Sequence, residues 1–191
     1  VAVLEKISAY SIRCVTRELA ELLKHDNGAI RGYAVRALAA TDGTESASEI
    51  FKLLKDTHPF VRLSAAEALG KFGDKKAAAA ISEMLDEKDE DVRAAAAGAL
   101  GNLEAREYAV KIAKLLNEER VEVRVSAASA LAQLGLREGV PVLLELSVKN
   151  GSWSDLDALN ALRRSELWAR LREKRLTADF SGTAVELWDS L

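Results

Sequence analysis

One pattern returns every 31 residues along most of this chain. Its clearest copy is Val61–Gly73, in which a Val-Arg pair is followed by two turns of small residues and then by Ala-Leu-Gly. The apolar residue that opens each copy recurs as Ile30, Val61, Val92 and Val123. A fixed period of this length indicates supersecondary units stacked in a row, each of which contacts only its neighbours. The chain is therefore predicted to be a helical repeat protein.

The apolar residues inside each copy follow one face of an α-helix. Counted from the opening residue, they fall at the start and again 4, 7, 8 and 11 residues later, the stripe of an amphipathic helix. The columns at 4 and 8 hold alanine and leucine: Ala34, Ala65, Ala96, Ala127 and Ala158, then Leu38, Leu69, Leu100, Leu131 and Leu162. Alternating small and large residues suit a core between stacked helices.

A second apolar stripe in each copy predicts a second helix. It consists of Ile50, Ile81, Ile112 and Leu143, followed one turn later by Leu53, Met84, Leu115 and Leu146. Gly43, Gly73 and Gly135 are expected in the tight turn between the two helices, where a positive φ costs a glycine little. The predicted fold is all-α, a right-handed α-solenoid built from 31-residue helical hairpins.

An arginine follows the opening residue in four copies, at Arg31, Arg62, Arg93 and Arg124. A polar turn precedes each of these positions, and its side-chain oxygens suit the cap of the helix that follows. Because the arginine recurs in every copy, we interpret it as a structural residue that bonds turn oxygens of its own or the next repeat, and not as an anion site.

The acid-rich turn, the Val-Arg pair, the Ala-Ala pair and Ala-Leu-Gly together resemble HEAT repeats, specifically the short kind named after phycobilisome lyases. The resemblance covers about residues 15–162. It implies that the Val-Arg helices line the concave side of the solenoid and that this side binds a partner.

The organisation of the chain follows from the same register. Residues 1–176 are predicted to form the solenoid, with an incomplete first repeat, four full repeats from about 26 to 149, and a divergent last repeat over 152–176. Residues 177–191 are predicted to be a capping segment, with Trp188 packed against residues 160–176. The chain begins at Val1 within a stretch already patterned as a helix, so we expect it to be a piece of a longer protein.

Several columns of the Val-Arg helix point away from the predicted core and carry more apolar residues than a solvated face should. Phe60 with Leu63 and Trp153 with Leu156 form two clusters on it. An exposed apolar strip indicates an interaction site, although Phe60 and Trp153 could instead staple neighbouring repeats. The candidate partner-binding residues are Phe60, Leu63, Arg36, Glu67, Asp91, Glu122, Val125, Trp153 and Leu156. The predicted function is a non-catalytic scaffold that binds a protein or peptide.

Two other functions stay open. The resemblance to bilin lyases implies a lyase-like or chaperone-type subunit, although the same repeat is widespread as plain scaffold. Some HEAT-like proteins are DNA alkylation glycosylases, so nucleic-acid binding is the other alternative. The middle of the expected groove is acidic, which disfavours phosphate contacts there. Possible phosphate or anion contacts lie only near the C-terminal end, at Arg163, Arg164, Arg170 and Arg172.

Composition disfavours other classes of function. The single cysteine, Cys14, excludes an internal disulfide and fits a reducing compartment, so we expect a cytoplasmic protein. A net charge of −3 and the lack of a long apolar run give no reason to expect a membrane partner. His25 and His58 have no acid or second histidine at ligand spacing on the same helix face, so no metal is expected. We also expect no cofactor and no catalysis, because no nucleophile, histidine and acid form a recognisable set.

Overall fold

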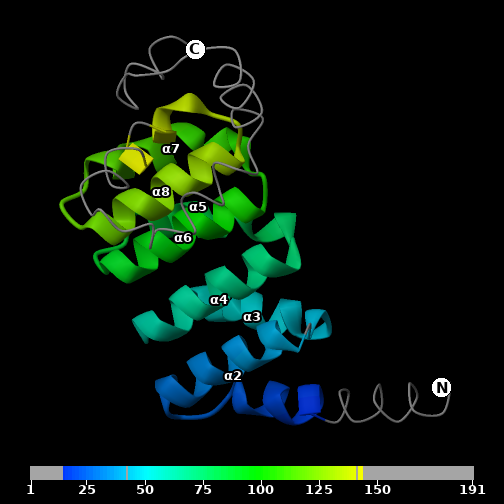
Figure 1. Ribbon diagram of the computed structural model, residues 1–191. Coiled ribbons are helices and arrows are strands. Elements are labelled where there is room, and N and C mark those ends of the chain that lie inside the picture. Colours follow the sequence, from blue (N-terminus) through cyan, green and yellow to red (C-terminus); the bar gives the residue numbers. More distant parts are fainter. Residues whose placement is uncertain (1–14, 42, 141, 144–191) are drawn as a thin grey trace, which may run out of the picture. The chain divides into compact units, whose positions relative to one another are not determined.

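The structure, a computed structural model, describes residues 15–41, 43–140 and 142–143, and the regular structure of these residues is entirely helical. Residues 15–22 are helical, and pairs of helices follow (Figure 1). The helices that begin near the Val-Arg pairs are α2 (Gly28–Ala40), α4 (Pro59–Phe72), α6 (Glu90–Asn102) and α8 (Val121–Gln133). The chain divides into two compact parts, Val1–Ala99 and Leu100–Leu191.

The second helix of each repeat is short and is flanked by 3-10 turns. The α-helical segments are α3 (Ala47–Lys52), α5 (Ala78–Glu83) and α7 (Ala109–Lys114). The 3-10 turns before them are η1 (Thr44–Ser46), η3 (Lys75–Ala77) and η5 (Arg106–Tyr108), and η7 (Arg137–Gly139) follows in register. The 3-10 turns after them are η2 (Leu53–Lys55), η4 (Met84–Asp86) and η6 (Leu115–Asn117). A 3-10 turn holds about three residues instead of 3.6, so the side that faces the core shifts at each junction.

The local sequence explains where the long helices begin and end. Asn27 caps α2, since its side-chain oxygen accepts a hydrogen bond from the backbone N–H of Ala29 at 2.8 Å. Helix α4 starts with Pro59, whose missing N–H is not needed in the first turn. It ends at Gly73, which takes the left-handed conformation with φ 70°.

The core of the first part lies between α2, α4 and the short helices beside them. Helices α2 and α4 run side by side in Figure 1 and pack against each other. The predicted leucine column is fully buried here, at Leu38 and Leu69, and Ala65 beside it is buried as well. Ile50 and Ile81 are also fully buried, which confirms the inward stripe of the second helices.

The second part is built from the same columns. Leu100, Ile112 and Leu131 are buried. A core cluster forms where α8 meets the residues after it, and it consists of Ala128, Ala132, Val140 and Leu143, with Leu116, Val125 and Val142 packed against it. The alanine and leucine columns therefore form the core here too.

Consecutive long helices come very close where the Ala-Leu-Gly motif falls. A Cβ added to Gly70 would lie 2.8 Å from Cα of Ala99, and one added to Gly101 would lie 2.8 Å from Cα of Ala130. Both contacts are with backbone, which cannot move aside as the end of a side chain can. Glycine is therefore needed at both positions for the helices to pack this closely.

The turn between the two helices differs in one respect from the prediction. Gly73 and Gly135 have positive φ as predicted, but Gly43 has a φ of −71° and does not. Gly43 lies one residue out of register with the other two. In the third repeat the left-handed position is taken by Glu104, with φ 56°, which lies 31 residues after Gly73. The turn thus keeps its shape without a glycine in that repeat.

Two apolar positions are less buried than predicted. Leu53 is only half-buried, while its neighbour Leu54 is buried. Met84 and Leu115 hold the same position at the start of η4 and η6 and are buried, so among the described repeats the lower burial is confined to the first full one. Ile30, which opens the first full repeat, is exposed, whereas the opening valines of the later repeats are buried. The predicted last repeat (152–176) and capping segment (177–191) lie outside the described residues, as do Leu146, Ala158 and Leu162.

Candidate interaction surface

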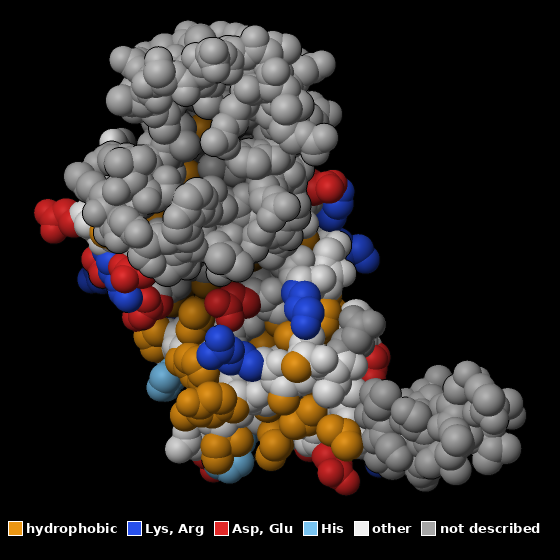
Figure 2. Space-filling model, in the orientation of Figure 1, with side chains coloured by type: hydrophobic (Ala, Val, Ile, Leu, Met, Phe, Trp, Pro, Cys, Tyr) orange, Lys and Arg blue, Asp and Glu red, His pale blue; other side chains and the backbone are white. Residues whose placement is uncertain are grey.

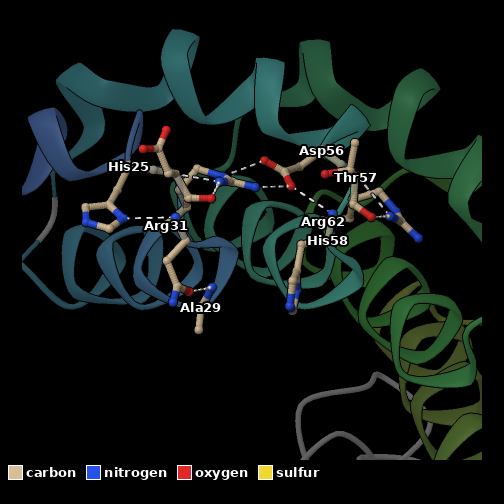
Figure 3. Close-up of polar contacts among 9 residues, drawn as sticks. His25, Ala29, Arg31, Asp56, Thr57, His58 and Arg62 are labelled. Atoms are coloured by element: carbon tan, nitrogen blue, oxygen red, sulfur yellow. Dashed lines mark hydrogen bonds and ion pairs between the residues drawn. The ribbon is translucent and has the colours of Figure 1, made fainter.

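Two of the recurring arginines, Arg31 and Arg62, join the turns of neighbouring repeats. Figure 3 shows Arg31 between the turn of its own repeat and the turn of the next. Its Nη1 donates to the carbonyl oxygens of His25 at 2.7 Å and Asp26 at 3.0 Å. Its Nε and Nη2 donate to the two carboxylate oxygens of Asp56, at 2.8 and 2.7 Å. One guanidinium therefore binds two backbone carbonyls and a carboxylate at once.

Arg62 repeats this arrangement one step along the chain. Its Nη1 donates to the carbonyl oxygens of Asp56 at 2.9 Å and Thr57 at 3.3 Å, and its Nη2 to Oε2 of Glu87 at 3.0 Å. Arg93 and Arg124 also bind two carbonyl oxygens each in the turns that precede them. The prediction that these arginines bond turn oxygens is confirmed, and the acids that receive Arg31 and Arg62, 25 residues later, are recognisable in the sequence.

We call the successive pairs Arg31–Asp56 and Arg62–Glu87 the ladder. In its first pair, hydrogen bonding shifts the pKa of both partners. Burial alone would raise the pKa of the Asp56 carboxyl, but hydrogen bonds from Arg31 and from the backbone N–H of His58 outweigh that effect and lower it. The hydrogen bond to Asp56 also raises the pKa of Arg31. The charges are thus used within the fold, which leaves these arginines poorly placed to bind a phosphate.

Phe60 is the centre of an aromatic cluster between α2 and α4. Its ring lies over Gly32, where an added Cβ would come within 2.4 Å of the ring. Tyr33 meets the ring edge-on, with 5.1 Å between ring centroids, and His58 does so at 6.5 Å. The guanidinium carbon of Arg36 lies 5.9 Å from the centroid of the same ring. Phe60 therefore does staple neighbouring repeats, the alternative that the sequence left open.

The cluster is nevertheless part of the molecular surface. Phe60 and Leu63 are only half-buried, and Tyr33 is 64% exposed. Figure 2 shows hydrophobic side chains gathered over the region of α2 and α4, with basic side chains beside them. Tyr33 was not among the predicted site residues. The signal that could have identified it is an aromatic residue in a column where the other repeats carry serine or alanine.

Arg36 and Glu67 flank this cluster. Arg36 Nη2 lies 4.0 Å from Oε2 of Glu67, and about half of each side chain is exposed. Partial burial raises the pKa of the Glu67 carboxyl, and the positive charge of Arg36 opposes that shift. A pair this exposed and this long contributes little to folding, so both side chains are available to a partner.

The other predicted site residues are placed as follows. Asp91 and Glu122 are exposed, each in the first turn of its helix. Val125 is half-buried and packs against the core cluster of the second part, so it presents less apolar surface than predicted. Trp153, Leu156, Arg163, Arg164, Arg170 and Arg172 lie outside the described residues. The apolar cluster at Trp153 and the anion contacts therefore stay predictions.

The described residues give little basis for other kinds of site. A surface hollow of about 440 Å³ lies beside the Arg62–Glu87 pair and is lined in part by Leu54 and Met84. Asp56, Arg62 and Glu87 also line it, and all three already take part in the arginine–acid pairs described above. Within the described ranges, no three His, Cys, Asp or Glu side chains are grouped to hold a metal ion, and no helix is long and apolar enough to cross a membrane.

Comparisons with known proteins bear on the fold. A family model described as HEAT repeats matches residues 16–101 and 80–163. No curated protein matches the chain. Among solved structures, an engineered protein is 23% identical, with a TM-score of 0.56 and an alignment over 78% of this chain and 77% of that one. The complex of CpcE and CpcF of phycocyanin lyase from Nostoc sp. PCC7120 is 22% identical, with a TM-score of 0.63 and an alignment over 86% of this chain and 71% of that one.

Each structural likeness shows a common fold. The family match, by contrast, spans most of the sequence and falls on the columns that form the core. The helical pairs, the buried alanine and leucine columns and the matched repeats agree with one another. The chain therefore belongs to the HEAT-repeat family, and its fold is an all-α stack of helical repeats.

Proposed function

We propose that the chain is a non-catalytic scaffold that binds a partner protein on the exposed side of the Val-Arg helices, with its main contact on α2 and α4. HEAT repeats are the framework of protein-interaction scaffolds, and the repeat register supports that assignment. The observation that carries the proposal is the half-exposed aromatic cluster. Tyr33, Phe60 and Leu63 present apolar surface, and the exposed Arg36 and Glu67 flank it.

This arrangement fits the anatomy of protein interfaces. Aromatic residues and arginine are enriched at the centres of such interfaces, where a few side chains supply most of the binding energy. Phe60 is held in place by Gly32 and Tyr33, so a partner would meet a ring that is already ordered. A preordered anchor loses little conformational entropy on binding.

Site-specific photo-crosslinking tests the proposal. A photoreactive amino acid at Leu63 or Arg36 should capture a discrete protein from a lysate of the source cell. The matched controls are Lys52 and Glu83, which are exposed on the short helices of the same part. Capture from Leu63 but not from Lys52 supports binding on the Val-Arg helices. Equal capture from both positions, or none from either, contradicts it.

A substitution gives an independent measurement. Leu63→Ser should weaken binding of the captured protein by about tenfold or more, while thermal stability changes little, because Leu63 is only half-buried. Leu63 is a better choice than Phe60, because removing the Phe60 ring would also remove its packing against Gly32. Unchanged binding by Leu63→Ser would argue that the partner binds elsewhere.

The alternative is a bilin-lyase-like subunit, which the structural likeness to the CpcE and CpcF complex favours. A lyase-like subunit should bind a linear tetrapyrrole, and visible absorbance that co-elutes with the protein would detect it. Co-eluting absorbance of that kind would support a role in pigment handling and argue against a plain scaffold. The crosslinking result and the absorbance result are separate, so either function can be rejected alone.

A further inference from the structure

Three charged side chains are exposed on the side of α2 and α4 where we propose that a partner binds. They are Arg36 on α2 and Glu67 and Lys71 on α4. One acid and two bases do not by themselves indicate which charge the partner carries. The contacts that each side chain already makes within the fold are therefore compared first.

Lys71 is used within the fold. Its Nζ donates a hydrogen bond to the carbonyl oxygen of Ala39, in the last turn of α2, at 2.6 Å. Carbonyl groups at the C-terminal end of a helix lack partners within the helix, and the helix dipole is negative there, so an ammonium group is stabilised at this point. A carboxylate of a partner would have to draw Lys71 away from that carbonyl or share it.

Arg36 is engaged with the aromatic cluster. Its guanidinium carbon lies 5.9 Å from the centroid of the Phe60 ring. Its Nη2 lies 4.0 Å from Oε2 of Glu67, which is too long for a hydrogen bond. The guanidinium therefore helps to order the ring, and it gives the carboxylate only a weak electrostatic partner.

Glu67 is thus the charge that lacks a close partner. Within the described ranges, the ionic partner of its carboxylate is Arg36 alone. The carboxyl is nevertheless partly withdrawn from water, which raises its pKa. A carboxylate in this state gains from a further hydrogen-bond donor, because a partly buried charge without a hydrogen bond is costly.

The place of Glu67 on α4 decides which part of a partner can reach it. Phe60, Leu63 and Glu67 are spaced three and four residues apart, so they follow one side of the helix. A partner that covers Phe60 and Leu63 with an apolar side chain would bring a neighbouring side chain to Glu67. One repeat later the position of Phe60 is taken by Asp91, which is exposed, so the next helix of this part adds an acid on the same side.

We infer that the partner presents a basic side chain next to an apolar one, with the apolar side chain on Phe60 and Leu63 and the lysine or arginine beside it paired with Glu67. The inference rests on the proposed function, since it names the chemistry of the partner at the same site. Arg36 stays over the Phe60 ring. A segment with an acid at this point would meet the carboxylate of Glu67 at close range and be repelled.

Selection from a displayed library of short random peptides tests the chemistry of the partner, with the full chain immobilised as the bait. Peptides enriched on the wild type should carry lysine or arginine close in sequence to an aliphatic or aromatic residue. Fluorescence anisotropy with an enriched, labelled peptide then gives its dissociation constant for the full chain and its variants.

The two members of the exposed pair should have opposite effects on this peptide. Glu67→Gln should raise the dissociation constant by about tenfold, because the basic side chain loses its carboxylate. Arg36→Gln should lower the dissociation constant or leave it unchanged, because a competing cation is removed. The matched control is Glu83→Gln on α5, an exposed acid of the same part, which should bind as the wild type does. Circular dichroism should show that all three variants stay folded.

The possible results distinguish this inference from the proposed function. Enriched peptides that are acidic, or that bind Glu67→Gln as tightly as the wild type, overturn the basic partner; if Leu63→Ser still weakens their binding, the proposed site stands. Peptides that bind Leu63→Ser as tightly as the wild type contradict both. A library from which no peptide is enriched also contradicts both, since the surface is then not open to a partner.

Discussion

Arg31 and Asp56 form a two-bond ion pair across neighbouring repeats, with Nη2–Oδ1 and Nε–Oδ2 distances of 2.7 and 2.8 Å. Little of either side chain is exposed, at 14% and 8%. The planar fork of the guanidinium matches the carboxylate and still leaves Nη1 for two backbone carbonyls. Among the described ion pairs it therefore holds two repeats together most directly.

Removing one partner of this pair should be costly. Asp56→Ala leaves a largely buried guanidinium without its carboxylate and the N–H of His58 without its acceptor, so the free energy of unfolding should fall by about 2–4 kcal/mol. Urea unfolding measures this fall in the free energy of unfolding. The control is Glu67→Ala, which breaks an exposed pair and should cost less than about 1 kcal/mol. Equal losses in the two variants would refute the structural role of the ladder.

The lowered pKa of Asp56 predicts a specific pH dependence. A carboxyl whose pKa is lower in the folded state stabilises the fold at every pH above its unfolded value, which is about 3.9. That stabilisation is lost as the pH falls from the unfolded value through the folded one. The difference in unfolding free energy between wild type and Asp56→Asn should thus be constant near neutral pH and shrink below about pH 4. A difference that grows on acidification would contradict the assignment.

Leu100 tests the register of the core. It is fully buried in the leucine column, so Leu100→Ala should lower the free energy of unfolding by about 2–5 kcal/mol. Val110→Ala, at a highly exposed position of α7, should change it by less than about 0.5 kcal/mol. Chemical denaturation of both variants provides the comparison. A loss below about 1 kcal/mol for Leu100→Ala would be incompatible with its burial.

The left-handed turns give a pair of opposite predictions. Gly73 has φ 70° and nothing lies within 4 Å of an added Cβ, so Gly73→Ala should destabilise the protein by about 1 kcal/mol through backbone conformation alone. Glu104 holds φ 56° without being glycine, so Glu104→Gly should be neutral or stabilising by up to about 1 kcal/mol. Thermal unfolding distinguishes the two directions. Destabilisation by Glu104→Gly would show that its side chain has contacts that outweigh the strain.

Gly32 and Phe60 should show strong coupling. A methyl group on Gly32 would collide with the Phe60 ring, so Gly32→Ala should cost about 1–3 kcal/mol. In Phe60→Ala the same glycine substitution should cost far less, because the ring is gone. A double-mutant cycle by urea unfolding measures the difference. Additive effects would mean that Phe60 does not occupy that space.

The sequence predicted the long helices and their core well because the repeat has no insertion. Once Leu69 was in register, Leu38, Leu100 and Leu131 followed by counting, and all of them are buried. The errors lie where local geometry departs from the α-helix. Leu53 is less buried than predicted although its counterparts Met84 and Leu115 are buried, so counting along the repeat does not predict how fully each repeat covers this position. Gly43 was wrongly expected to have a positive φ, because a glycine near a turn need not be its left-handed residue.

The candidate site was predictable only in part. The partial exposure of Phe60 and Leu63 was predictable from the 3.6-residue period, which turns both away from the core columns. The packing of Phe60 on Gly32 was not predictable, because it depends on how α2 and α4 are offset along their axes. Tyr33 was missed because its column is buried in the next two repeats, at Ser64 and Ala95, so the repeat register gives no reason to expect exposure there.

The two members of each ladder pair also have a fixed order along the chain. In each resolved step the arginine stands 25 residues before the carboxylate that it binds, at Arg31 and Asp56 and again at Arg62 and Glu87. A ribosome therefore completes each guanidinium before its acceptor, and folding that starts at the N-terminus presents a fixed donor to every new turn as it emerges. In such folding each bond would form as soon as its acceptor is made, against a repeat that is already in place.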